Sequence, residues 1–274
     1  MVSGVSIFAM VVTLLVTLVA PIVVWIVYTV KNKEKKVGGA VLLGAAGFFV
    51  MQIVIRLSII SMLSLSPSYM SFAANHYVLY CLILAFTAAL VEVIARYVVA
   101  KILTKKLTYE HGIVAGLGHG GIEAIMLIGM TYINNLLYSV MINTGMYDVM
   151  VEQTAALGVD TTALITAKEQ LIGTSAAVFL LAGYERVLTI ILHTALSLLV
   201  CYFVRRKKDL AGISICLLIH MLVDFVSPVI TGLGTSYLGS KISLTTSYVL
   251  TYVFLTLVAI GSVLVIRKVK KSWE

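Results

Sequence analysis

Ten ionisable residues interrupt stretches of the chain that are otherwise apolar. They are Arg56, Glu92, Arg96, His119, Glu123, Glu185, Arg186, His193, His220 and Asp224. Imidazole and carboxylate groups are the usual ligands of catalytic zinc, and a further carboxylate can act as general base towards a water molecule. Proton and ion pathways through membranes use the same residue types. The set therefore predicts either a metal centre or a buried polar network.

Most of these residues lie four positions apart, so they share a face of a helix. The pairs are Glu92 with Arg96, His119 with Glu123, and His220 with Asp224. Glu185 and Thr189 precede His193 at the same spacing. Each of the helices that carry them can therefore direct one polar stripe towards a common site.

The composition indicates what kind of helices carry these stripes. Of all residues, 61% are hydrophobic and 12% are charged, whereas soluble domains carry roughly 25% charged residues. A transmembrane helix needs about 20 apolar residues. The segments that meet this condition are residues 4–30, 38–63, 77–103, 110–141, 174–204, 211–233 and 243–266. We expect an all-α fold, a polytopic membrane helix bundle with seven transmembrane helices.

Basic residues mark alternate ends of these segments. Of the 20 Lys and Arg residues, 15 lie in four short clusters, at residues 31–36, 101–106, 205–208 and 267–271. The positive-inside rule places these ends in the cytoplasm, so we expect the N-terminus outside and the C-terminus inside. The basic rim would attract anionic membrane lipid, which explains the net charge of +8 without a nucleic-acid partner.

The histidines and carboxylates are predicted to lie at one depth in the membrane. Counted along each helix from its cytoplasmic end, the depths are about 14 Å for His119 and His220, about 16 Å for Glu92 and His193, and about 20 Å for Glu123 and Asp224. Isolated ionisable groups are costly there, so one shared site is the economical interpretation. Arg56 lies near the outer end of its segment, where its side chain can snorkel to the interface, and we assign it no function.

We expect a single integral membrane domain, residues 1–274. Its catalytic core comprises the helices of residues 77–233, and the helices of residues 1–76 and 243–266 are peripheral. The connection 142–173 is predicted to be external. It contains DTTALITAKEQL, whose N-cap residues and apolar spacing predict a short helix that is a lid or a tether.

Other features of the apolar segments are explained by packing. The first segment lacks the basic n-region and cleavage site of a signal peptide, so we expect it to be retained. Cys81, Cys201 and Cys216 have no CxxC spacing, and we expect core residues rather than a disulfide or a thiolate metal site. The sequence GLGHGGIEA at 116–124 contains Gly116, Gly118, Gly120 and Gly121 around His119. These glycines serve either helix packing or a close approach of the backbone to the site.

The polar motifs, taken in order along the chain, resemble the YhfC family of intramembrane metalloproteases. The motifs are ExxxR (Glu92, Arg96), HGGIE (His119 to Glu123), ER with a later histidine (Glu185, Arg186, His193) and HxxxD (His220, Asp224). That family is related to the type II CAAX prenyl proteases, the PrsW proteases and the non-catalytic scaffold subunit of γ-secretase. The resemblance spans roughly residues 92–224.

The resemblance implies a glutamate-dependent metalloprotease core. Glu92 matches the activating glutamate, and His193 and His220 match the two later histidines. Glu123 matches the second-motif glutamate of the PrsW proteases, and Asp224 stands where the CAAX proteases have an Asn that contacts the oxyanion or the substrate.

The chain also departs from the CAAX pattern, which begins with paired glutamates, because Val91 precedes Glu92. A mechanism that needs two adjacent carboxylates would have to recruit Glu123 or Asp224.

We therefore predict an intramembrane zinc protease of the cell membrane that hydrolyses a peptide or membrane-protein substrate in or near the bilayer. Its catalytic residues are Glu92, Arg96 and Asp224, and Arg96 either holds Glu92 ionised or binds an oxyanion. The metal ligands are His193 and His220, joined by His119 or Glu123. The alternative is a proton- or ion-coupled transporter or a non-enzymatic scaffold that uses the same residues.

The depth of the site also predicts its access. Because the shorter route for water comes from the cytoplasmic ends, we expect a polar cavity that opens inward or laterally. Ala115 and Cys216 would then be accessible from the inside.

Overall fold

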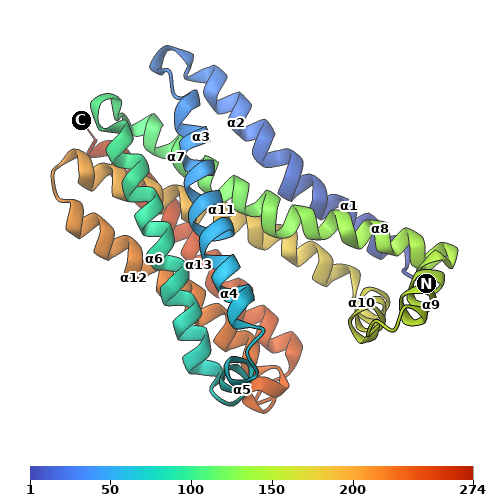
Figure 1. Ribbon diagram of the computed structural model, residues 1–274. Helices are drawn as coiled ribbons and strands as arrows, with labels where there is room; N and C mark the ends of the chain where they lie inside the picture. The colour runs from blue at the N-terminus through green and yellow to red at the C-terminus, as the bar shows by residue number, and fades with distance from the viewer. Residues whose placement is uncertain (274) are drawn as a thin grey trace. The chain divides into compact units, whose positions relative to one another are not determined.

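The computed structural model describes residues 1–273, and this range is helical without a strand (Figure 1). Seven helical segments are long and apolar enough to cross a membrane. They are Gly4–Lys31, Gly38–Leu63, Tyr77–Lys106, Tyr109–Thr144, Ala176–Arg205, Asp209–Leu233 and Leu244–Lys271. These spans agree closely with the segments predicted from hydropathy, so the predicted all-α polytopic bundle is confirmed. The orientation of the termini stays a prediction.

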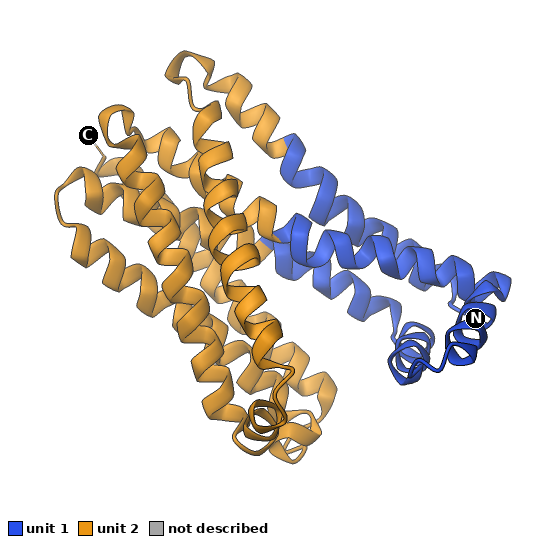
Figure 2. Cartoon of the chain, viewed as in Figure 1, with its two compact units in different colours: residues 1–23, 124–187 blue, residues 24–123, 188–274 orange. Residues whose placement is uncertain are grey.

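The chain folds as two compact units (Figure 2). Unit 1 contains residues 1–23 and 124–187, and unit 2 contains residues 24–123 together with the chain from residue 188 onward. The polar residues that could form a metal centre all belong to unit 2, except Glu185 and Arg186.

Unit 1 is a small helical cluster with its own apolar core. Its elements are α1 (Gly4–Leu14), η1 (Leu15–Val19), the start of α2 (Ala20–Lys31), η5 (Ala124–Gly129), α8 (Met130–Thr144), α9 (Met146–Ala156), α10 (Thr162–Gly173) and the first part of α11 (Ala176–Arg205). Met10, Tyr132, Tyr147 and Phe179 are among its buried core residues. The hydroxyls of Thr13 and Tyr132 both donate to the Phe179 carbonyl, at 2.7 and 2.9 Å, which joins α1 and α8 to α11.

The connection 142–173 is largely helical. The helix predicted in DTTALITAKEQL is present as α10, and α9 precedes it as a second helix that was not predicted. The Tyr147 hydroxyl donates to the Leu164 carbonyl at 2.9 Å, and Lys168 pairs with Asp148. These contacts hold α9 and α10 against each other.

Unit 2 carries the larger core. Its elements are the rest of α2, η2 (Lys33–Lys35), α3 (Gly38–Phe48), η3 (Phe49–Leu57), α4 (Ser58–Leu63), α5 (Pro67–Asn75), α6 (Tyr77–Leu103), η4 (Thr104–Lys106), α7 (Tyr109–Glu123), the rest of α11, α12 (Asp209–Leu233), η6 (Ser236–Leu238) and α13 (Leu244–Lys271). Helix α3 packs against α6 and α7, while α12 packs against α6 and α13. Cys81, Cys201 and Cys216 are buried free thiols, as predicted.

The glycines of α7 face different neighbours, and they serve both helix packing and a close approach to the site, since a Cβ atom at Gly120 would lie 3.0 Å from His193 Cβ. A Cβ atom at Gly116 would lie 2.5 Å from the Thr194 Cα of α11, and one at Gly118 would lie 2.2 Å from the Val41 carbonyl oxygen of α3. At Gly121 it would lie 2.6 Å from the ring of Trp25. Close backbone approach on these sides fixes α7, and with it His119, between its neighbours.

Gly44→Ala is expected to destabilise unit 2 strongly, because the new Cβ would lie 2.0 Å from the carbonyl oxygen of Ala115. Over-packing costs about 1–3 kcal/mol even where side chains can shift, and here the backbones of α3 and α7 would have to separate. Gly39→Ala is the matched control on α3, since nothing lies within 4 Å of its Cβ position. Thermal unfolding in detergent measures the difference, and equal midpoints for the two variants would contradict the prediction.

Candidate metal centre

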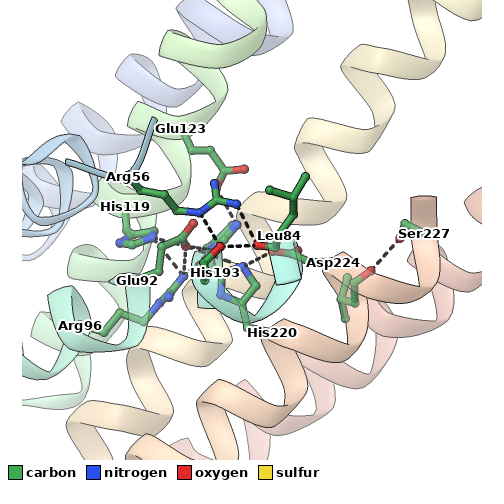
Figure 3. A network of polar contacts seen from close by, with 12 residues as sticks. Arg56, Leu84, Glu92, Arg96, His119, Glu123, His193, His220, Asp224 and Ser227 are labelled. Carbon is green, nitrogen blue, oxygen red and sulfur yellow. Dashed lines mark hydrogen bonds and ion pairs between the residues drawn. The ribbon is translucent and has the colours of Figure 1, made fainter. Parts of the chain in front are cut away.

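Four helices of unit 2 bring the seven predicted site residues to one place (Figure 3). They come from α6 (Glu92, Arg96), α7 (His119, Glu123), α11 (His193) and α12 (His220, Asp224). All except Asp224 are buried, and the Asp224 side chain is 33% exposed. The structure therefore brings together the residues that the spacing of four had indicated, while their roles in a site stay a prediction.

One carboxylate oxygen lies among the three imidazoles. The Oε2 atom of Glu92 is 2.9 Å from His119 Nε2 and 3.7 Å from both His193 Nδ1 and His220 Nε2. The ring centroids of His119 and His193 are 5.2 Å apart, and those of His193 and His220 are also 5.2 Å apart. One nitrogen of each ring is therefore directed to the same small volume.

Glu123 contacts His193 at the ring nitrogen that faces away from Glu92, whereas Asp224 contacts the same His220 nitrogen that faces Glu92. Glu123 Oε2 lies 2.6 Å from His193 Nε2, and Asp224 Oδ2 lies 3.3 Å from His220 Nε2. The His193 tautomer that donates from Nε2 to Glu123 has its lone pair at Nδ1, which faces Glu92. Carboxylates that orient a histidine through its second ring nitrogen are typical of metal centres.

Arg96 supplies the positive charge inside the cluster. Its Nη2 donates to Glu92 Oε2 at 3.1 Å and lies 3.0 Å from His119 Nε2 and 2.5 Å from His193 Nδ1. A guanidinium only donates, so a hydrogen bond from Nη2 to either imidazole uses the lone pair of that ring nitrogen. His119 Nε2 also lies 2.9 Å from Glu92 Oε2, and it can accept from Arg96 or donate to Glu92 but not do both. Nη2 has two N–H groups for these three atoms and therefore cannot donate to all of them at once.

The donor set fits a divalent metal ion. Glu92, His119 and His193 each offer a ligand atom, and these atoms lie within 4.8 Å of one another. Neutral imidazole and carboxylate are borderline to hard ligands of the kind that zinc takes in catalytic sites. These donors are buried away from bulk water, and Glu123 is a second carboxylate that contacts His193.

Arg56 and Arg186 both have polar partners within the protein and are not isolated charges. Arg186 pairs with the adjacent Glu185, in unit 1. Arg56 does not snorkel, and that prediction was wrong: its Nη2 donates to the Leu84 carbonyl at 2.8 Å and its Nε to Thr87 Oγ1 at 3.1 Å. Helix α6 thus offers the guanidinium acceptors at its own depth, so it need not reach the interface (Figure 3).

The expected opening towards Ala115 and Cys216 is not present. Both residues are buried, and Cys216 has no exposed surface. The cavity next to Ala115 has a volume of only about 10 Å³. Of the site residues, only Asp224 is partly exposed, at the opposite end of the polar stripe on α12 from Cys216. Close packing of α7 by its glycines explains why the Ala115 side is shut.

Ser197 also lies next to the site, although none of the sequence motifs includes it. It lines the same small cavity as Arg96, His119 and Cys201, and its hydroxyl has no hydrogen-bond partner. It lies four residues beyond His193 on α11. The spacing that identified the other pairs could therefore have indicated it.

Comparisons with known proteins identify similar sequences. The profile of the YhfC intramembrane metalloprotease family matches residues 15–239. The uncharacterized membrane protein YhfC of Bacillus subtilis (strain 168) is 33% identical over 139 residues, which cover 50% of this chain and 52% of that protein. The chain thus spans about half the length of the curated relative in this match. No solved structure matches.

Proposed function

The chain belongs to the YhfC family, and we propose that it is an intramembrane metalloprotease that hydrolyses a peptide bond in or near the membrane. The family is described as intramembrane metalloproteases, and the buried glutamate and histidine group could hold a metal ion. The relationship to the CAAX and PrsW proteases, the identity of the metal as zinc and the location in the cell membrane belong to the same proposal.

The single observation that carries this proposal is the convergence of three imidazole nitrogens on Glu92 Oε2. We assign His119, His193 and His220 as the metal ligands and leave Glu92 as the general base. Glu123 then orients His193 instead of binding the metal, because its carboxylate contacts the ring nitrogen that faces away from Glu92.

When bound, the metal would polarise the scissile carbonyl and make a water molecule easier to deprotonate. Glu92 accepts a proton from that water while the oxygen forms a bond to the carbonyl carbon. The same carboxyl group then returns the proton to the amine nitrogen as the carbon–nitrogen bond breaks. In the structure the carboxylate of Glu92 is paired with Arg96, whose Nη2 lies 3.1 Å from Glu92 Oε2.

Asp224 is assigned to the substrate side of the site. It is the most exposed of the seven residues, with a side chain 33% accessible, and it also contacts His220. A peptide segment that enters from this side meets Asp224 before it meets Glu92. We propose a peptide or a membrane protein as the substrate, delivered within the lipid bilayer.

A transporter or a non-enzymatic scaffold is the alternative function, since a buried network of His, Arg and carboxylates also serves those roles. Helix α12 remains helical through Pro228, and α6 and α7 contain no proline. Transporters commonly break the helices at their binding site. The continuous helices therefore favour the protease.

Metal analysis tests the proposal directly. The full-length protein, purified in detergent, is expected to contain about one zinc ion per chain, which a strong chelator removes and added zinc restores. Zinc should also raise the thermal unfolding midpoint of the depleted protein, because a ligand that binds only the folded state stabilises it. A protein that retains no divalent metal and gains no stability from any would support the transporter or scaffold instead.

A further inference from the structure

Arg96 stands where a metal ion would have to bind. Its Nη2 is 3.1 Å from Glu92 Oε2, 3.0 Å from His119 Nε2 and 2.5 Å from His193 Nδ1. The imidazole lone pairs that accept from this nitrogen are the ones that a metal ion would use. The guanidinium and a metal therefore compete for the same lone pairs and cannot hold them at the same time.

A small cavity lies beside Arg96 and His119. It is lined by Gly44, Ala115, Ser197 and Cys201 together with Arg96 and His119, and its volume is about 10 Å³. That is room for about one water molecule. The small residues Gly44, Ala115, Ser197 and Cys201 leave this space beside Arg96.

The polar atoms that face this cavity lack partners. Among the described residues, Arg96 Nε, Arg96 Nη1 and Ser197 Oγ have no hydrogen-bond partner, although Arg96 is 3% and Ser197 4% exposed. Buried polar groups in proteins are almost always hydrogen-bonded. An unused guanidinium edge and an unused hydroxyl acceptor thus share one cavity.

We propose that Arg96 is a built-in counter-cation of the metal site: it occupies the metal position in the metal-free protein and turns towards Ser197 when a metal ion binds. This inference rests on the proposed metal site. In the metal-free state the guanidinium compensates the charge of Glu92 and holds His119 and His193 in place. Metal binding replaces one cation by another, so neither state leaves an uncompensated carboxylate in the membrane.

The first test is the zinc affinity of Arg96→Met, measured on metal-depleted full-length protein by competition with a chromogenic chelator. Removal of the competing cation is expected to tighten zinc binding by about 5- to 150-fold, the usual range for coupled binding events. Arg205→Met is the control for removal of a guanidinium from unit 2, because Arg205 donates to the Trp273 carbonyl at the far end of α11. Its zinc affinity should equal that of the wild type.

The second test uses Ser197→Ala, a small change that leaves the packing of α11 intact. Loss of the acceptor for the displaced guanidinium should weaken zinc binding when Arg96 is present. It should have no effect in the Arg96→Met background, so that the two substitutions are non-additive. Metal-free Arg96→Met should also unfold at a lower temperature than the wild type and should regain more stability from zinc.

The outcomes separate this inference from the proposed function. If the wild-type protein binds zinc and Arg96→Met binds it equally or more weakly, the counter-cation proposal is wrong. The proposed metalloprotease function is not affected by that result. An equal effect of Ser197→Ala in both backgrounds overturns the movement towards Ser197. Absence of zinc binding in all variants overturns both proposals, whereas binding by Arg96→Met alone supports the counter-cation.

Discussion

Glu92→Gln is expected to bind zinc within about tenfold of the wild-type affinity while its hydrolysis of membrane substrates falls by about 10²- to 10⁴-fold. Glutamine has the shape of glutamate and can still accept a hydrogen bond from Arg96 through its amide oxygen. It cannot accept a proton from water at neutral pH. If His119, His193 and His220 hold the metal, the substitution removes the base and leaves the ligands.

The measurement compares cells that express equal amounts of wild type and variant. New protein termini in the membrane fraction, quantified by mass spectrometry, report hydrolysis without knowledge of the substrate, and elemental analysis of the purified proteins reports zinc. Glu110→Gln on α7 is the control, because Glu110 pairs with Lys35 and lies outside the site. Loss of zinc together with hydrolysis in Glu92→Gln would place Glu92 among the ligands and assign the base to another residue.

The transmembrane spans could be predicted from the sequence because the bilayer imposes their length. A helix that crosses it needs about 20 apolar residues whatever it packs against. The meeting of Glu92 with His119, His193 and His220 could be predicted for a related reason. Residues four apart share a face of a helix, and the depth of a residue follows from its position along the helix because the rise per residue is constant.

The directions of the side chains within that layer depend on packing, which a single sequence does not reveal. Arg56 was expected at the interface, but the π-helical stretch η3 (Phe49–Leu57) changes the rotation per residue, and the guanidinium meets acceptors on α6. The cavity between Arg96 and Ser197 depends likewise on how closely α3, α7 and α11 approach. No motif encodes that distance.

Access to the site was mispredicted because depth alone does not determine accessibility. Ala115 lies closer to the predicted cytoplasmic end than His119, yet the carbonyl of Ala115 touches Gly44 of α3 and shuts that side. Of the seven site residues, Asp224 has the most exposed side chain.

The sequence left open whether His119 or Glu123 is the third metal ligand, and the geometry favours His119. Its Nε2 is 2.9 Å from Glu92 Oε2, on the side of the imidazole cluster that also contains His193 Nδ1. Glu123 contacts His193 at the opposite ring nitrogen, 2.6 Å away. Removal of a metal ligand should weaken zinc binding more than removal of a residue that only orients a ligand.

His119→Ala is therefore expected to lose stoichiometric zinc, because a site with two remaining imidazoles binds far more weakly than one with three. Glu123→Gln should keep the site and weaken zinc binding by about 10- to 100-fold, as is usual when the partner of a ligating histidine is changed.

His111→Ala is the control for removal of a buried imidazole from α7, since His111 is hydrogen-bonded to Thr108 and lies about two helical turns from His119. Its zinc content should equal that of the wild type. Chelator competition on the three purified variants ranks them, and loss of zinc in Glu123→Gln with retention in His119→Ala would make Glu123 the third ligand.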